Sequence, residues 1–106
     1  MAAIKRVTTT TLKVLQALHE AGEPTWGVRI MQTSGLLSGT VYQILERLER
    51  GGLVTSEWEA DSDRRGPRRR LYQLTETGEE ALNHVRAIRE GVEAAKALAK
   101  AQAGLA

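Results

Sequence analysis

The spacing of apolar residues predicts three short helices in the first half of the chain. Apolar side chains recur every three or four positions in three segments, which places them on one face of a helix. The segments run from Thr9 to Glu20, from Trp26 to Gln32 and from Ser38 to Arg50. Turn-forming residues at 21–24 and 33–37 separate them. A threonine should cap the first helix and Thr25 the second, with Trp26, Ile30 and Val28 facing inward.

The third predicted helix has one apolar and one polar face. Its apolar positions follow the i, i+3, i+4, i+7 pattern and should be buried: Val41, Ile44, Leu45 and Leu48. The opposite face carries polar side chains: Thr40, Gln43, Arg47 and Arg50. Ser38 should cap this helix by accepting a hydrogen bond from a first-turn N–H. The glycine pair at 51–52 should end it.

Two strands and a basic loop should follow. Leu53–Trp58 and Arg70–Leu74 alternate apolar and polar residues, as strands with one buried face do. The loop between them, Glu59–Arg69, is broken by Gly66 and Pro67. Five of the chain's fifteen Lys and Arg residues fall between Arg64 and Arg70. The sequence therefore predicts a hairpin with a strongly basic tip.

A long helix should end the chain, capped by Thr75 or by Thr77. Its apolar residues step by three and four: Leu82, Val85, Ile88, Val92, Ala95 and Leu98. A core built from so short a chain cannot bury this whole stripe, so we expect two copies to pair through it as a two-fold dimer. The alternative is that the stripe folds back on the first helix of its own chain.

Composition narrows the possible functions. The chain of 106 residues has room for one modest core. It has no cysteine, which excludes disulfides and thiolate metal sites, and His19 and His84 have no second ligand at metal spacing. No catalytic motif is present, so we expect neither an enzyme nor a cofactor. Residues 1–11 lack an apolar signal core and no apolar run is long enough for a membrane span, so we expect a cytoplasmic protein without a membrane partner.

The order of helix, helix, helix, strand, loop, strand and long helix is typical of a winged helix-turn-helix protein that binds double-stranded DNA. The expected fold is mainly α with a small β-hairpin. Residues 1–75 should form the DNA-binding domain, and residues 76–106 a dimerisation helix. The loop Glu59–Arg69 would then be the wing, a basic ribbon beside the recognition helix, which is the helix 38–50.

The recognition helix offers groups for phosphates and for bases. Ser38, Gly39 and Thr40 lie in its first turn, where free N–H groups suit a phosphate. Thr40 and Gln43 can reach base edges, since glutamine bonds adenine and the threonine methyl contacts thymine. Tyr42 and Arg47 can bind phosphates. Each has a simpler interpretation: Tyr42 as a packing residue, Gln43 as an inert surface residue, and Arg47 as a partner of a neighbouring glutamate.

The wing offers arginines for the flanking backbone or a narrow minor groove: Arg64, Arg65, Arg68 and Arg69. A run of charge is usually a solvated loop, but here the nearby acids that we expect to matter are only Asp61 and Asp63. We also expect Arg50 to pair with a glutamate on its own helix. Trp26 and Trp58 should be core residues rather than platforms for stacking.

The chain resembles the PadR family of bacterial transcriptional regulators. The resemblance rests on LLSGTVYQILERLERGGLV (36–54), on the wing-to-helix pattern and on Trp26–Ile30, and it covers nearly all residues up to Leu82. The matching positions are Ser38, Gly39, Thr40, Tyr42, Leu45, Leu48, Glu49, Gly52, Trp58, Gly66, Arg69, Tyr72, Leu74, Thr75 and Gly78. The resemblance implies a sequence-specific DNA-binding repressor that acts as a homodimer on a palindromic operator.

Other functions have less support from the residues. Some PadR members respond to flat apolar small molecules, but the final helix here has no aromatic residue to stack on one, so an effector is unsupported. The main alternative is a winged-helix module of a phage or plasmid that binds another protein, against which the basic wing argues. The MarR and ArsR families share the wing, but the chain lacks the helices that frame a MarR dimer and the metal ligands of ArsR proteins.

Overall fold

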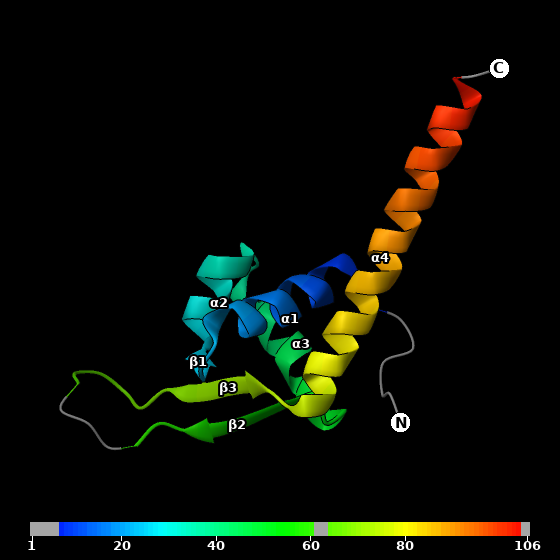
Figure 1. Ribbon diagram of the computed structural model, residues 1–106. Coiled ribbons are helices and arrows are strands. Elements are labelled where there is room, and N and C mark those ends of the chain that lie inside the picture. The colour runs from blue at the N-terminus through cyan, green and yellow to red at the C-terminus, as the bar shows by residue number, and fades with distance from the viewer. Residues whose placement is uncertain (1–6, 61–63, 105–106) are drawn as a thin grey trace.

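The computed structural model describes residues 7–60 and 64–104, which form four helices and three strands (Figure 1). In chain order these are α1 (Thr9–Ala21), β1 (Thr25–Trp26), α2 (Gly27–Ser34), α3 (Ser38–Arg50), β2 (Val54–Trp58), β3 (Arg70–Leu74) and α4 (Glu76–Ala103). α1, α2, α3 and the sheet pack into one body, and α4 projects from it (Figure 1). The molecule therefore measures 67 Å along its longest axis, against 29 and 23 Å across. The predicted winged helix-turn-helix fold with a long C-terminal helix is confirmed.

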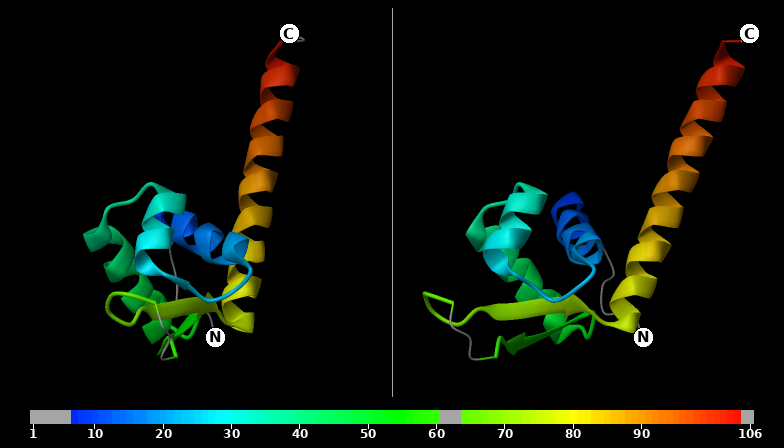
Figure 2. Two further views of the ribbon diagram at one scale, coloured as in Figure 1. Left: turned by 90° about the vertical axis from the view of Figure 1, so that its left-hand side faces the viewer. Right: turned by 60° about the vertical axis from the view of Figure 1, so that its left-hand side comes forward.

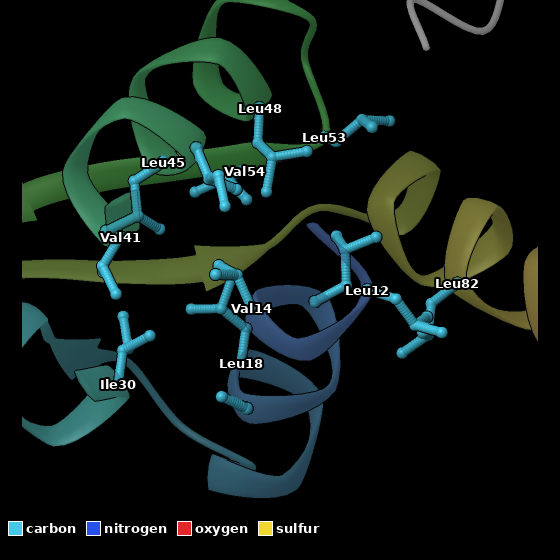
Figure 3. Close-up of a cluster of buried hydrophobic side chains, with 13 residues drawn as sticks. Leu12, Val14, Leu18, Ile30, Val41, Leu45, Leu48, Leu53, Val54 and Leu82 are labelled. Atoms are coloured by element: carbon cyan, nitrogen blue, oxygen red, sulfur yellow. The ribbon is translucent and has the colours of Figure 1, made fainter. Parts of the chain in front are cut away.

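The core lies between α1, α2, α3, the sheet and the first turns of α4 (Figure 3). The predicted apolar face of α3 is buried along its whole length, from Val41 to Leu48. Leu15 of α1 and Ile30 of α2 fill the space opposite it and are also almost fully buried. Because each buried Leu or Ile side chain contributes roughly 1.5–3 kcal/mol, this face fixes how α3 sits on the body.

The sheet has a third strand that the sequence pattern did not predict. The strand order is β1-β3-β2, and both pairings are antiparallel. Thr25 in β1 pairs with Tyr72, so the expectation that Thr25 caps α2 is wrong. The residue at the N-cap is Trp26, which makes no side-chain cap hydrogen bond. Two residues are too few for an alternating pattern, and their pairing depends on a strand far along the chain.

The predicted helix caps are confirmed at α1 and α4, and the cap of α3 is wrong, as is that of α2. The Thr75 hydroxyl accepts a hydrogen bond from the Gly78 N–H at 3.0 Å. Thr8 does the same for the Thr11 N–H at 3.2 Å. Ser38, however, is the first residue of α3, and the extended residue before it is Leu37, which has no hydroxyl to offer. The first turn of α3 is therefore left without a side-chain cap.

The base of α4 belongs to the core. Leu82 is fully buried within its own chain, and Val85 is half-buried against the same cluster. The prediction of Leu82 as a dimer-interface residue is therefore wrong, because this side chain is already covered by the body. Gly78 allows the close approach, since a Cβ there would collide with the Leu53 carbonyl oxygen.

A polar contact joins the same part of α4 to α1. His19 Nδ1 lies 2.8 Å from Glu79 Oε2, across the C-terminal end of α1 and the first turns of α4. The first turns of α4 thus pack on α1, as the alternative to a dimer predicted for the whole stripe, while the rest of the helix extends away (Figure 1).

Among the described residues, no cluster of His, Cys, Asp or Glu is placed to hold a metal ion. No described helix is both long enough and apolar enough to span a membrane.

Candidate nucleic-acid interface

The outer face of α3 is exposed where the sequence predicted contacts with DNA. Ser38 and Gly39 in the first turn are exposed, and Thr40 is half-buried. Gln43 and Arg47 are exposed on the face opposite the core. Within the described part of the chain, the Arg47 side chain makes no hydrogen bond or ion pair with another residue. This face is therefore available to a partner molecule.

Arg50 and Glu46 form the expected ion pair on the same helix. Arg50 Nη2 lies 2.6 Å from Glu46 Oε1, one helical turn away. The side chains are 73% and 70% exposed, respectively. An exposed pair of this kind contributes little, about 0.3–0.5 kcal/mol. The simpler interpretation of Arg50 as a solvated surface charge is confirmed.

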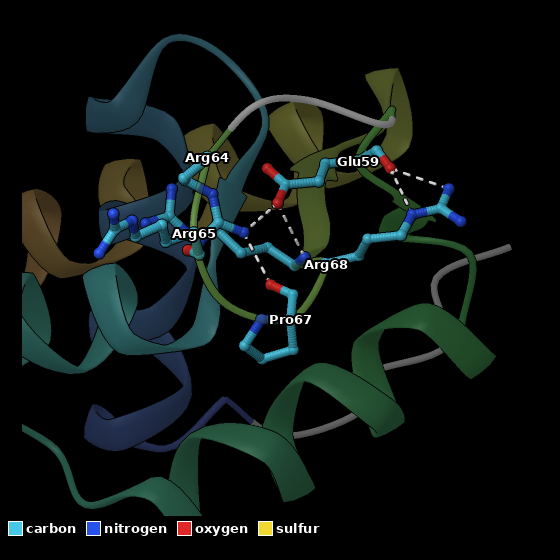
Figure 4. A network of polar contacts seen from close by, with 6 residues as sticks. Glu59, Arg64, Arg65, Pro67 and Arg68 are labelled. Carbon is cyan, nitrogen blue, oxygen red and sulfur yellow. Dashed lines mark hydrogen bonds and ion pairs between the residues drawn. The ribbon is translucent and has the colours of Figure 1, made fainter.

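The wing arginines have an internal partner that the sequence pattern did not reveal. Arg64 donates to the carboxylate of Glu59, and Arg68 donates to the backbone carbonyl of Glu59 at 3.0 and 3.1 Å (Figure 4). Asp61 and Asp63, the acids expected to matter, lie outside the described residues. The only feature of the sequence that could have identified Glu59 as their partner was its position a few residues before the arginines. The loop brings Glu59 against the side chains of Arg64 and Arg68.

The recognition helix and the wing open onto a common hollow. It measures about 530 Å³ and is lined by residues 26–28, Tyr42 of α3, Trp58, wing residues 64 and 67–69, and Arg70 of β3. In the left view of Figure 2, α3, α2 and the described part of the wing lie next to one another. A single anionic molecule can therefore contact α3 and the wing together.

Tyr42 lies between α3 and the start of α2. A Cβ at Gly27 would overlap the Tyr42 hydroxyl, so glycine at this position is what allows the tyrosine to pack there. The Tyr42 side chain is still 45% exposed in the hollow. Tyr42 therefore packs against the start of α2 and is also accessible at the surface, and its contact with a phosphate stays a prediction. Burial raises the pKa of the Tyr72 hydroxyl in β3 above its usual value.

The two tryptophans are not core residues, contrary to the prediction. Trp58 is 59% exposed and Trp26 is half-buried. The guanidinium of Arg69 lies 3.9 Å from the ring centre of Trp26, and that of Arg70 lies 5.2 Å from that of Trp58. Such cation–π contacts cover an aromatic face with a charged group in place of apolar side chains. Val28, also expected to face inward, is 52% exposed and lines the hollow.

Side-chain hydrogen bonds connect the two strands of the hairpin, β2 and β3, to α3. Arg70 Nε donates to the Ser56 hydroxyl at 3.0 Å, and Ser56 donates to Glu49 of α3 at 2.7 Å. Arg70 is therefore tied to the strand beside it and to the recognition helix. The hairpin and α3 are thereby linked by side chains as well as by the core.

Comparison with known proteins agrees with this geometry. The model of the PadR-like family of transcriptional regulators matches residues 12–84, more than half of the chain. A PadR-like transcription factor of Bacteroides fragilis has a TM-score of 0.69 and 28% identity, over 80% of this chain and 84% of that one. A PadR family regulator of Eggerthella lenta has a TM-score of 0.63 and 27% identity, over 74% and 72% of the two chains.

A PadR family regulator of Clostridium difficile has a similar fold, with a TM-score of 0.73 at 22% identity, over 83% of this chain and 94% of that one. No curated protein matches the chain. Members of the matched family are transcriptional regulators and not enzymes. The exposed face of α3, the arginine-rich wing beside it and the match over residues 12–84 lead to one conclusion: this chain belongs to the PadR-like family and is a DNA-binding transcriptional regulator.

Proposed function

We propose that the protein is a cytoplasmic repressor that binds a palindromic operator as a homodimer. The observation that carries this proposal is the combination of two surfaces on one chain. One is the face formed by α3 and the wing, and the other is an apolar stripe on the part of α4 that projects from the body. The first surface suits DNA, and the second suits another copy of the chain.

The dimer argument rests on exposed apolar side chains in α4. Ile88 is 53% exposed, Val92 46% and Leu98 60%, and Ala95 is exposed between them. Val85 joins this stripe to the core. Exposed apolar residues in a row along one helix favour burial against a partner, and a symmetric pair buries the same stripe on both chains. Leu82 supports the helix from inside the body and takes no part in this interface.

The proposed contacts with DNA are divided between α3 and the wing. Thr40 and Gln43 read base edges in the major groove. The first turn of α3, Ser38 and Gly39, receives a phosphate. Tyr42, Arg47 and the wing arginines contact the sugar-phosphate backbone. The DNA-binding unit predicted as residues 1–75 then includes the base of α4, and the dimerisation segment is the projecting part of residues 76–106.

Two-fold pairing of α4 presents two recognition helices to one side of a duplex. The expected operator is therefore roughly palindromic, with half-sites about one helical turn apart. A dimer on such a site blocks RNA polymerase when the operator overlaps a promoter, which is the basis for proposing a repressor.

Selection of bound duplexes from a random pool tests the proposal. A symmetric consensus, together with a dimer by analytical ultracentrifugation, is the expected result. An asymmetric consensus bound by a monomer would contradict the dimer. A failure to enrich any sequence would contradict specific readout. Transcription in vitro from a template that carries the consensus then tests repression, and increased transcript would show activation instead.

A further inference from the structure

Glu59, at the start of the wing, is bonded to several residues near its end. Its carboxylate accepts hydrogen bonds from the Arg64 guanidinium and from the Arg69 backbone N–H, the latter at 3.1 Å. Its backbone carbonyl accepts two from Arg68, and its own N–H donates to the Arg69 carbonyl at 2.8 Å. Glu59 thereby joins the start of the wing to its last residues, with three arginines bonded to it.

Electrostatic repulsion between a carboxylate and the phosphates of DNA does not favour a glutamate at this position. A negative charge on a loop that faces DNA repels phosphates, and removing it should strengthen binding. Yet the Glu59 side chain is only 18% exposed, held inside the loop. The hydrogen bond from Arg64 holds the pKa of Glu59 below its usual value. Glu57, which lies in β2 two residues before Glu59, is by contrast exposed.

Arg64 is directed into the wing as well. Besides the Glu59 carboxylate, its guanidinium donates to the carbonyls of Pro67 at 2.7 Å and of Arg65 at 2.9 Å. These bonds span the turn at Gly66, whose φ of 99° is a conformation that other residues rarely adopt. Arg64 therefore connects Glu59 to the tip of the loop.

Arg65 has the opposite arrangement. It is exposed, its side chain points away from the bonded group (Figure 4), and it makes no side-chain hydrogen bond or ion pair within the described residues. Arg69 lies over the Trp26 ring at the edge of the hollow that α3 shares with the wing. The wing thus contains two arginines whose side chains bond to the loop, Arg64 and Arg68, and two that do not, the exposed Arg65 and the half-buried Arg69 at the edge of the hollow.

We propose that Glu59 is a positioning residue for DNA binding: through Arg64 and the Arg69 backbone it holds the wing in the shape that presents Arg65 and Arg69 to the duplex. This inference rests on the proposed contact between the wing and DNA. It assigns Arg64, which the sequence pattern placed among the DNA contacts, to the internal support of the wing. It also predicts that loss of a negative charge at position 59 weakens binding to a polyanion.

Charge-neutral substitution at two neighbouring glutamates tests the proposal. Glu59→Gln and the matched control Glu57→Gln remove the same charge from the same hairpin. The affinity of the full chain for one duplex of arbitrary sequence, the same for all variants, is measured over a range of salt concentrations. Glu57→Gln should bind as tightly as the wild type or more tightly. Glu59→Gln should bind about tenfold more weakly, the size expected when one charge-assisted hydrogen bond is removed.

The salt dependence separates positioning from a general loss of stability. The slope of log affinity against log salt should become shallower in Glu59→Gln by roughly 0.9 for each phosphate that the wing no longer neutralises, while the midpoint of thermal unfolding stays near that of Glu57→Gln. A Glu59→Gln variant that binds like Glu57→Gln would overturn the role of Glu59 and leave DNA binding by the wing intact. A wild-type chain that binds no duplex would overturn both.

The double variant shows whether Glu59 acts through Arg64. If it does, Glu59→Gln combined with Arg64→Ala binds no more weakly than Arg64→Ala alone. Additive losses of affinity would mean that the two residues act separately and would contradict the inference. Arg64→Ala also provides the test from the other partner if the Glu59 variant does not fold.

Discussion

The two DNA-facing elements, α3 and the wing, obtain their shapes in different ways. α3 is held by its backbone hydrogen bonds and by a buried apolar face, so its outer side chains are left to face a partner. The wing has no regular secondary structure among its described residues, and side chains bonded to its own backbone shape it. In α3, support and recognition therefore belong to different residue types. In the wing, arginine serves for both, so substitution of Arg64 or Arg68, whose side chains bond to the loop, changes shape and charge together.

The largest expected effect is on the support of α3. Leu48→Ala removes a side chain that is 1% exposed in the core, and such truncations lower the free energy of unfolding by about 2–5 kcal/mol. DNA binding should disappear together with the fold. Urea denaturation measures the change.

Leu37→Ala is the matched control, since Leu37 adjoins the same helix but is 79% exposed. It should leave the free energy of unfolding nearly unchanged. Equal destabilisation by the two variants would contradict the view that the buried face holds α3 on the body.

Removal of four wing arginines should have the next largest effect. Arg64, Arg65, Arg68 and Arg69 replaced together by alanine should weaken binding to every duplex on the order of 100-fold, because at least two charge-assisted hydrogen bonds to phosphate disappear at about 1.5 kcal/mol each. The salt dependence should flatten. Electrophoretic mobility shifts at several salt concentrations measure both, and unchanged affinity would remove the wing from DNA binding.

A substitution on α3 should change specificity and leave general affinity in place. Gln43→Ala removes an exposed side chain that supports no internal contact in the described structure. Discrimination should fall by about 1–3 kcal/mol at one or two base pairs, with non-specific binding preserved. Repeating the selection with this variant measures the change. A uniform loss of affinity over all sequences would show that Gln43 does not read bases.

The smallest expected effect is at the exposed ion pair of α3. Arg50→Ala breaks the contact with Glu46 and should lower the free energy of unfolding by no more than about 0.5 kcal/mol. Thermal unfolding at low and high salt measures it, and the difference from wild type should vanish at high salt. A destabilisation of more than about 1 kcal/mol would mean that surface charges stabilise α3 more than expected.

Much of the fold was predictable from local patterns. The apolar faces of α1 and α3, the hairpin strands and the Thr75 cap each depend on residues close together in the chain. The exposed positions of Gln43 and Arg47 followed from the same helical periodicity. The family resemblance added the expected function, and the match over residues 12–84 confirmed the family.

The sequence by itself determined the four helices and the two strands of the hairpin, because backbone geometry ties side-chain spacing to the face that is buried. Only the tertiary structure decided the pairing of Thr25 with β3, the burial of Leu82, the exposure of Trp58 and the bonds of Glu59 across the wing. These features depend on residues brought together from separate parts of the chain, where no local period reports the contact. A tryptophan or a glutamate has the same local signature whether it is buried, exposed or bonded to an arginine ten positions away.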